Sequence, residues 1–444
     1  MVSRLFVLLL FLCSEISWSA AREYWVRPEF ISDCDTKQPC LSLSTVVRNT
    51  TAYFTSNSIF HFLPGSHTVH ETSWVIVRRV HNVSLVGSSL GGRYATIECN
   101  GRMSFTFDQV RNLSISYMEF SACGLVMDLQ CCLYMHPFLV SCPHVALLVS
   151  DTSSVVLEYV RVRNSYGYGL LVWNVVKTTL INCQFYCNNW RSHKEKDYER
   201  VSMHHMGCPS SHEHNEPGGN VLILQGAVLD LQILYLNISH SEFAYGVARK
   251  ANSSKIIIGG GGLGIYTLQN KRTEFYIQIC NCSLHNNISP FGANMFLYYG
   301  DIDEYITSLY FIQQNNYYTV HINNCKFYNG SSASSGGGLA LYFREACPHL
   351  NSYLLSLCKS QIRFIIEHCT FNSNIAEYGS GVYMYTNTVY GTYLPSKVRG
   401  SQIIISDTLF FENTATIGGG AIYLSIGWNT NLPFILKSPS LGLS

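Results

Sequence analysis

The chain has 444 residues and is nearly neutral, with 29 Lys and Arg against 28 Asp and Glu. Only 13% of its residues are charged, against a usual share of roughly 25%. A formal net charge of +1 provides no electrostatic footprint for DNA, RNA or an acidic membrane. The composition therefore excludes nucleic acid as a predicted partner.

The first residues predict a secretory signal over residues 1–21. Arg4 precedes an apolar run from Leu5 to Leu12, and small residues follow at a spacing typical of cleavage sites. No later stretch contains 18 consecutive uncharged apolar residues, so we expect no transmembrane segment. These features predict a secreted, extracellular protein in which cysteines pair as disulfides.

Residues 22–74 predict an N-terminal cap, because they lack the repeat that fills the rest of the chain. A solenoid needs a cap, since its end coil exposes an apolar face and open strand edges. Residues 24–26 are expected to form a strand, and residues 41–54 a short amphipathic helix that seals the open end. Cys34 and Cys40 are disulfide candidates that would close a small loop.

One phrase recurs from residue 115 onward and predicts a solenoid. It reads apolar, any, turn residue, small, any, apolar, as in residues 180–185 (Leu-Ile-Asn-Cys-Gln-Phe). Asn, Asp and His are enriched at positive φ, so two period-2 strands are expected to meet at a bend on the third residue. The expected bend residues are Tyr117, Tyr159, Asn182, His240, Asn281, Asn324, His368 and Asp407.

The spacing of the bends gives the size of one coil. Tyr159 and Asn182 lie 23 residues apart, which fits three short strands and three turns at about 3.3 Å per residue. Longer intervals are one coil plus an inserted loop, and the 58 residues from Asn182 to His240 are either one such coil or two. A second phrase, glycines followed by alternating apolar residues as at residues 418–423, lets coils approach closely.

This pattern resembles the right-handed parallel β-helix of the pectate-lyase-like superfamily. Phe-x-x-Asn at residues 410–413 with Gly-Gly-Ala-Ile at residues 419–422 also resembles the repeats of chlamydial polymorphic outer-membrane proteins and of uncharacterised secreted sponge-type β-helix proteins. The resemblance implies an all-β solenoid with long inserted loops over residues 75–425. Residues 426–444 are then a C-terminal tail, either a makeshift cap or the point where a longer chain is cut.

The cysteines fall into two groups. Four occupy the position directly after a bend, where stacked coils would align them in an internal column about 4.8 Å apart: Cys183, Cys282, Cys325 and Cys369. A column does not provide the tetrahedral arrangement that zinc needs, so buried thiols are expected. Cys347 and Cys358 bracket an insertion and are disulfide candidates, because a bridge restrains a loop that has no core. Another insertion contains Cys123, Cys131, Cys132 and Cys142.

Asn-x-Ser/Thr sequons beside a secretory signal predict N-glycosylation. The predicted sites are Asn49, Asn82, Asn112, Asn237, Asn252, Asn287 and Asn329. Asn281 also begins a sequon but is left out, because it occupies a strand bend.

The insertion after Asn189 is rich in histidine and acidic residues. Its candidate metal ligands are His204, His205, His212 and His214. Such tracts bind zinc or copper in some proteins, but no recognised ligand spacing is present. A solvated polar loop is the favoured interpretation, and we predict no metal and no cofactor.

Outward positions after the bends are where a β-helix would carry catalytic groups. In successive coils they are Glu119, Arg161, Gln184, Glu242, Ser283, Lys326, Thr370 and Leu409. Glycoside hydrolysis needs two carboxylates about 5 to 9.5 Å apart, and no two neighbours in this row are acidic. Arg161 and Arg163 are the best candidates for a lyase base, but surface placement explains them equally well.

The sequence therefore favours a non-catalytic recognition, adhesion or structural role. A glycan or protein ligand would meet the inserted loops 190–217, 300–316, 344–359 and 386–400, which are rich in tyrosine. These tyrosines are Tyr298, Tyr299, Tyr305, Tyr310, Tyr317, Tyr318, Tyr353, Tyr390 and Tyr393; packing of the loops on the solenoid would account for them as well. The alternative is a carbohydrate-active enzyme, a polysaccharide lyase or glycoside hydrolase acting on an extracellular glycan.

Overall fold

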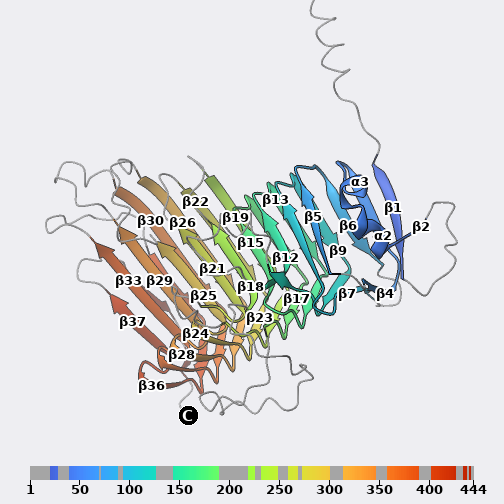
Figure 1. The fold of residues 1–444 in the computed structure, drawn as a ribbon. Helices are drawn as coiled ribbons and strands as arrows, with labels where there is room; N and C mark the ends of the chain where they lie inside the picture. Colours follow the sequence, from blue (N-terminus) through green and yellow to red (C-terminus); the bar gives the residue numbers. More distant parts are fainter. Residues whose placement is uncertain are drawn as a thin grey trace, which may run out of the picture.

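The structure is a computed structural model, and it describes most of the chain in separate stretches. They are residues 21–28, 40–69, 72–88, 94–126, 144–189, 219–225, 232–248, 259–268, 273–300, 314–346, 358–389, 402–426, 434–437 and 440–441. Their strands form one elongated stack, which starts with the blue N-terminal strands and ends with the red C-terminal strands (Figure 1). No helix among these residues is long and apolar enough to cross a membrane.

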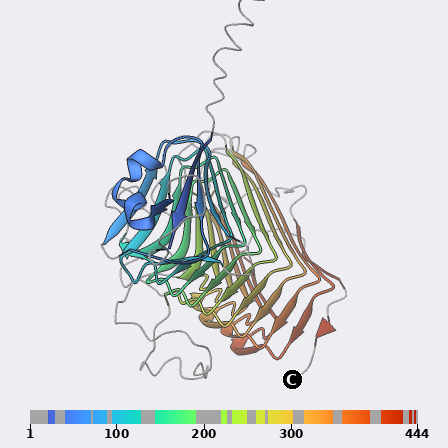
Figure 2. The same cartoon turned by 90° about the vertical axis from the view of Figure 1, so that its right-hand side faces the viewer.

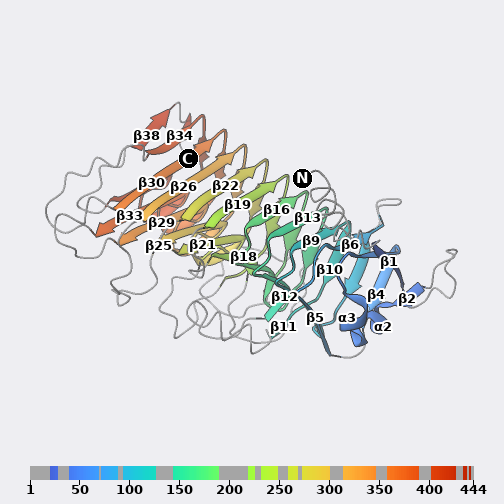
Figure 3. The same cartoon turned by 90° about the horizontal axis from the view of Figure 1, so that it is seen from above.

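Three long parallel sheets run along the stack (Figures 1 and 3). Sheet A contains β1 (Arg22–Arg27), β2 (Cys40–Ser42), β3 (Ser58–Phe62), β6 (Val83–Gly87), β9 (Asn112–Ser116), β13 (Ser154–Glu158), β16 (Lys177–Ile181), β19 (Gln232–Ser239), β22 (Thr273–Cys280), β26 (Gln314–Asn323), β30 (Cys358–Glu367), β34 (Gln402–Ser406) and β38 (Phe434–Lys437). Sheet B contains β4 (Gly65–Thr68), β7 (Ala95–Glu98), β10 (Met118–Ser121), β14 (Arg161–Arg163), β17 (Gln184–Tyr186), β20 (Glu242–Ala244), β23 (Ser283–His285), β27 (Lys326–Tyr328), β31 (Thr370–Asn372), β35 (Leu409–Phe411) and β39 (Ser440–Leu441). Sheet C contains β5 (Ser73–Arg78), β8 (Met103–Asp108), β12 (His144–Ser150), β15 (Tyr168–Trp173), β18 (Gly219–Gln225), β21 (Leu263–Leu268), β25 (Met295–Gly300), β29 (Leu339–Ala346), β33 (Val382–Val389) and β37 (Ile422–Ile426), with β11 (Leu125–Val126) antiparallel to β12.

Each coil adds one strand to sheet A, one to sheet B and one to sheet C, and the next coil stacks on it in register. Figure 2 shows these coils one behind another. The chain is a right-handed parallel β-helix, so the predicted fold class is confirmed. A fourth short sheet joins the coils that begin at β22, β26, β30 and β34, and it contains β24 (Ile288–Phe291), β28 (Ser331–Ser335), β32 (Ile375–Tyr378) and β36 (Thr414–Gly418). These coils therefore have four strands instead of the three that the sequence predicted.

All eight predicted bend residues adopt a left-handed backbone, with φ between 47° and 55°. A second column of left-handed residues follows sheet B, and the sequence analysis missed it. Its members are Ala122, Asn164, Cys187, Tyr245, Asn286, Asn329, Ser373 and Glu412. Ala, Ser and Glu are not typical at positive φ. The left-handed conformation of Ala122, Ser373 and Glu412 therefore follows from their place in the stacked coils and not from their residue type.

Two expected boundaries differ in the structure. The strands β3, β4 and β5 already form a complete coil, so the coils begin at Ser58 and not at residue 75. This first coil lacks the recurring phrase. Its strands still alternate between buried and partly exposed residues, as over Ser58–Phe62. At the other end, β38 and β39 extend sheets A and B. The interval from Asn182 to His240 spans one coil, with β17, β18 and β19 as its strands.

The predicted helix near the N-terminus is present as two short helices, α2 (Leu43–Arg48) and α3 (Thr50–Tyr53). Ser42 caps α2, since its Oγ accepts a hydrogen bond from Thr45 N at 3.1 Å. Leu43 and Val46 are buried in the same apolar core as the coils. The helices lie against the N-terminal strands in Figure 1, as expected for a cap.

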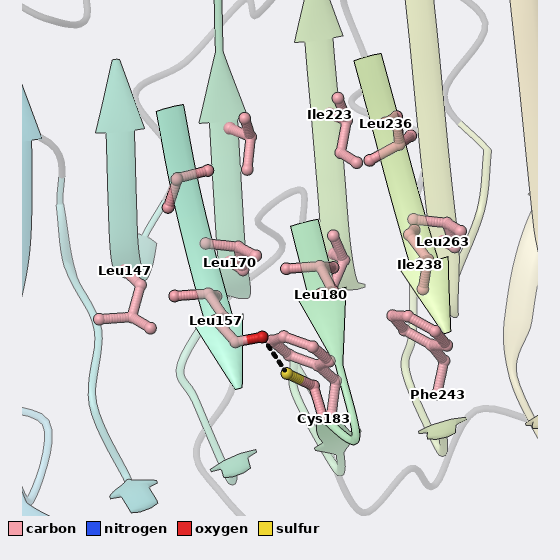
Figure 4. Close-up of a cluster of buried hydrophobic side chains, with 14 of the residues drawn as sticks. Leu147, Leu157, Leu170, Leu180, Cys183, Ile223, Leu236, Ile238, Phe243 and Leu263 are labelled. Carbon is pink, nitrogen blue, oxygen red and sulfur yellow. Dashed lines mark hydrogen bonds between the residues drawn. The ribbon is translucent and has the colours of Figure 1, made fainter. Parts of the chain in front are cut away.

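Inward side chains occupy equivalent positions in successive coils and fill the interior (Figure 4). Leu157 and Leu180 pair in register, and Ile238 follows them in the next coil. Phe185 stacks on Phe243 with ring centroids 5.5 Å apart and an interplanar angle of 7°. Columns of identical or similar side chains are thus the packing unit of this core.

The predicted cysteine column is also confirmed. The buried free thiols are Cys183, Cys282, Cys325 and Cys369. Ser241 takes the same position in the coil after Cys183. The backbone N of Cys183 donates a hydrogen bond to Ser241 Oγ at 3.0 Å. The Cys183 thiol donates to the carbonyl oxygen of Leu157 at 3.3 Å, shown dashed in Figure 4. Burial raises the pKa of this thiol to about 12, so it stays protonated and unreactive near neutral pH.

One disulfide joins two neighbouring coils, between Cys99 and Cys123. The sequence predicts Cys123 in a loop cluster, and its motifs do not identify Cys99 as the partner. Cys40 and Cys187 are also disulfide-bonded. Cys34, Cys347 and the side chain of Cys358 lie outside what the structure describes.

A column of buried asparagines runs along the corner after sheet B. Its members are Asn188, Asn220, Asn287, Asn294, Asn374 and Asn413, each hydrogen-bonded through Nδ2 to Oδ1 of the next at 2.9 to 3.3 Å. Their Nδ2 atoms also donate to backbone carbonyls, as from Asn374 to Phe327 O at 3.0 Å. We call this set the asparagine column.

The asparagine column requires glycine at fixed points. Asn220 is the second residue of β18 and Asn294 directly precedes β25. Their side chains reach into the corner of the following coil, at Gly246 and Gly330 respectively. A Cβ on Gly330 would lie 2.6 Å from Asn294 Nδ2 and 2.0 Å from the backbone oxygen of Gly337. Neither neighbour is a flexible chain end, so alanine does not fit there.

We predict that Gly330→Ala lowers the free energy of unfolding by about 2 kcal/mol or more, a typical overpacking cost. The matched control is Gly418→Ala, because a Cβ there would meet only the Tyr423 ring at 3.5 Å, an ordinary contact. The urea unfolding midpoint of each purified variant is the measurement. Equal midpoints for the two variants would contradict the proposed role of Gly330.

Candidate functional site

The outward face of sheet B carries two rows of polar side chains. The first row contains the residues that the sequence analysis aligned, and strand pairing places each beside the next as predicted. The second row lies two residues further along each strand and contains Arg163, Tyr186, His285 and Tyr328. We call the part of both rows from β10 to β27 the sheet B strip. The second row follows from the period-2 alternation of the strands but was not among the predicted outward positions.

Glu119 is at one end of the strip, between two arginines. Arg163 Nη2 lies 2.6 Å from Glu119 Oε1, and Arg161 Nη1 lies 3.9 Å from Oε2. The Glu119 side chain is only 8% exposed. The Arg161 guanidinium also lies 4.1 Å above the ring of Tyr94, an arrangement typical of cation–π attraction. Both carboxylate oxygens of Glu119 are therefore engaged by arginine.

Glu242, on β20 in the interior of the strip, is held by neutral and basic groups. His285 Nε2 lies 2.9 Å from Glu242 Oε1, and Gln184 Nε2 donates to Oε2 at 3.3 Å. Asn286 Nδ2 donates to His285 Nδ1 at 2.8 Å, which leaves the His285 proton on Nε2, facing Glu242. The hydrogen bond from His285 is the main reason that the pKa of Glu242 lies below its ordinary value.

Aromatic rings make the strip rigid. The His285 ring stacks on Tyr328 with centroids 4.5 Å apart, and Tyr245 meets it edge-on at 5.6 Å. Burial raises the pKa of the Tyr186 phenol, an effect that the neighbouring Arg163 opposes. The strip thus presents Tyr, Arg and His side chains in fixed positions, a composition typical of interfaces.

A small cavity lies inside the solenoid between sheets C and A. Its volume is about 30 Å³, and Val175, Thr178, Ile223 and Phe275 are among its lining residues. That is room for about two water molecules, far below the several hundred Å³ of a small-molecule site. This cavity is not a candidate ligand site.

Two of the predicted recognition tyrosines are interior residues, and this corrects the sequence analysis. Tyr299 and Tyr318 are 1% exposed, with ring centroids 4.9 Å apart. Strands β25 and β26 are long enough to include them, and alternation along the strands turns both side chains inward. Tyr317 is 43% exposed, and Tyr298 packs on the second apolar cluster. The other predicted tyrosines lie outside the described residues.

The predicted glycosylation sites have mixed outcomes. Five are exposed: Asn49, Asn82, Asn112, Asn237 and Asn329. Asn252 lies outside the described residues. Asn287 is fully buried in the asparagine column, and its Nδ2 donates to Phe243 O and to Asn294 Oδ1, both at 2.9 Å. The folded coil has no room for a glycan there, so the prediction for Asn287 is wrong.

The histidine-rich insertion with His204, His205, His212 and His214 lies outside the described residues, so its role stays a prediction. Within the described stretches, no group of three or more His, Cys, Asp or Glu side chains is placed to hold a metal ion.

No protein-family model and no curated protein matches the chain. Among solved structures it is similar to ORF18 of Geobacillus virus E2, with 13% identity, 86% of this chain and 53% of that chain covered, and a TM-score of 0.38. The chain therefore spans about half the length of the viral protein. The periplasmic alginate epimerase AlgG is 8% identical, with 91% and 83% covered and a TM-score of 0.39. PfbA, a surface adhesin of Streptococcus pneumoniae, is 9% identical, with 86% and 85% covered and a TM-score of 0.28.

At such identities the similarity concerns the β-helix fold alone, which enzymes and an adhesin share. The resemblance to the chlamydial repeats stays a prediction.

The lowered pKa of Glu242 predicts an acid-dependent contribution to stability. Because the carboxylate is favoured in the folded state, its contribution is complete above the unfolded pKa near 4.5 and is lost as pH falls through the folded value. We expect Glu242→Gln to lose less stability than the parent between pH 5 and 3 in urea titrations. Glu377→Gln, at an exposed position of β32, is the control and should follow the parent curve. A Glu242→Gln curve parallel to the parent would rule out this linkage.

Proposed function

We propose that this chain is a secreted or cell-surface glycoprotein that recognises a glycan or protein ligand without catalysing its conversion. The observation that carries the proposal is the double engagement of Glu119 by Arg163 and Arg161 on the sheet B strip. A general acid or base must reach the substrate. Glu119 instead lies beneath its arginines, where it fixes their guanidinium groups for contact with a ligand.

The placement of the second carboxylate agrees with this proposal. Register places Glu119, Arg161, Gln184 and Glu242 in consecutive strands, so the two carboxylates are three strand spacings apart, roughly 14 Å. Glycosidases use carboxylates about 5 to 9.5 Å apart. Glu119 and Glu242 are therefore too distant to act as a hydrolytic pair.

The strip is suited to an extended ligand. Arg161, Tyr186 and Tyr328 lie on β14, β17 and β27 of one sheet, and Tyr and Arg dominate the binding energy of many interfaces. A low overall charge of +1 favours a neutral or mixed-charge ligand over a polyanion. Glycans and protein segments both meet this description.

We expect the secreted protein to bind members of a glycan array or a panel of cell-surface proteins and to leave them unchanged. Arg161→Ala and Tyr328→Ala should each weaken binding by roughly tenfold or more, as interface anchors do. Lys177→Ala, exposed on sheet A, is the control and should bind like the parent. Binding that none of the strip variants alters would place recognition elsewhere.

A carbohydrate-active enzyme is the second candidate function, and one observation favours it. Glu98 pairs with Ser121 across β7 and β10, so it lies diagonally next to Glu119 in the second row. Diagonal neighbours in a sheet are about 7 to 8 Å apart, inside the range for inverting hydrolysis. Glu98 would then be the reachable member of the pair.

The same glycans distinguish the two functions when products are analysed by mass spectrometry. Our proposal predicts no shortened or unsaturated oligosaccharides from the parent protein. If products do form, and Glu98→Gln reduces the rate of product formation by roughly a hundredfold or more, the chain is a carbohydrate-active enzyme and the recognition proposal is wrong. Glu158→Gln, on sheet A, is the matched control.

A further inference from the structure

The outward face of sheet A carries an exposed pair of aromatic rings on neighbouring coils. Tyr235 of β19 and Tyr276 of β22 are in register, with ring centroids 5.3 Å apart and an interplanar angle of 13°. They are 47% and 38% exposed. We call them the tyrosine patch. Adjoining exposed aromatic side chains often mark a contact site. The contact can be assigned where the structure also shows which group would make it.

A sequon lies within reach of the tyrosine patch. Asn237 is two residues after Tyr235, so both side chains are on the outward face of β19, and Asn237 is exposed. Ser239 completes the Asn-x-Ser triplet. Asn237 pairs with Gln278, which makes Tyr276 its diagonal neighbour, within reach of a large side chain.

We infer that an N-linked glycan on Asn237 packs its first N-acetylglucosamine against the tyrosine patch. The inference requires passage through the secretory pathway, as residues 1–21 predict, and does not depend on the ligand proposed for the sheet B strip. The modification joins C1 of the sugar to Asn237 Nδ2. The bond from C1 to the diphosphate of a lipid-linked oligosaccharide breaks, the lipid diphosphate leaves with the electron pair, and Nδ2 gives up one proton.

The chemistry of the two surfaces is complementary. A pyranose ring and its N-acetyl methyl group present C–H bonds that pack on an aromatic face or edge, while the Tyr hydroxyls and Gln278 provide polar partners for sugar hydroxyls. Because Asn237 and Tyr235 are on one strand, the attachment point is held next to the rings. The linkage makes the contact intramolecular, so a modest attraction is enough to populate it.

Asn112 provides a built-in comparison. It is an exposed sequon on the outward face of the same sheet, in β9. Its pairing partner in the next coil is Ser154, its neighbour along the strand is Ser114, and its Nδ2 donates to Asn82 Oδ1 at 2.8 Å. No aromatic side chain is among these neighbours, so a glycan on Asn112 would extend into solvent.

The experiment measures how fast peptide N-glycosidase releases the Asn237 glycan from the native, secreted full chain, by glycopeptide mass spectrometry. A packed sugar is protected, and an aromatic contact of ordinary strength predicts release roughly fivefold slower than from the Tyr235→Ala and Tyr276→Ala variants. Tyr235→Phe keeps the ring and should retain most of the protection. After denaturation all proteins should release the glycan at the same rate.

Three results would overturn the inference: an unmodified Asn237, equal native release rates in the parent and the alanine variants, or protection that persists without either ring. Both tyrosines are exposed, so we expect the substitutions to leave the core intact, which the urea unfolding midpoint of each variant checks. The Asn112 glycan, where present in the same digest, should be released equally fast from all variants. These outcomes are independent of ligand binding by the sheet B strip, so the two proposals fail separately.

Discussion

The asparagine column is the interaction on which the rest of the structure depends. At the corner after sheet B the backbone turns while it is buried. Its N–H and C=O groups therefore need hydrogen-bond partners within the protein. Asn287 and Asn374 satisfy their own amides and accept from the backbone N of Gly246 and Gly330 at 2.8 and 2.9 Å. A shift of one residue in the stacking would break every link and turn the core side chains outward. The column therefore fixes the register of the coils from β17 to β36.

In-register stacking explains why the chain has so few charges. Each outward side chain has a neighbour about 4.8 Å away on both sides, and like charges at that separation are destabilising. Aromatic, amide, hydroxyl and thiol side chains stack without this penalty, and the 13% charged residues reflect that constraint. Where charges do occur, as at Glu119 and Glu242, a basic or neutral partner follows in an adjacent strand. The pairing on the sheet B strip is thus a requirement of the scaffold as well as a property of the site.

The sequence predicted the fold because the recurring phrase encodes a local geometry: an apolar strand, a residue tolerant of positive φ and a second strand. It located all eight bends after sheet A and the cysteine column. It missed what depends on neighbouring coils. Glu412 and Ala122 adopt positive φ although their residue types are not typical there. Cys99 pairs with Cys123 across coils. Asn287 begins a sequon, but only its burial shows that it is not a glycosylation site. The second row of the strip, with Arg163 and His285, was encoded by period 2, but its contacts with Glu119 and Glu242 follow only from the stacking.

The shape of the scaffold limits what kind of ligand it can bind. The described coils enclose an apolar core that stacked side chains fill, and their strands present outward faces on which a ligand can bind. A face made of strands is nearly flat along the solenoid axis and repeats every strand spacing, which suits long ligands that contact several coils. The outward faces of sheets A and B carry different side chains. On sheet B ion pairs hold Glu119 and Glu242 in place, whereas on sheet A two stacked tyrosines lie beside a sequon. The side chains that stack at the surface therefore decide what each face of the β-helix can contact.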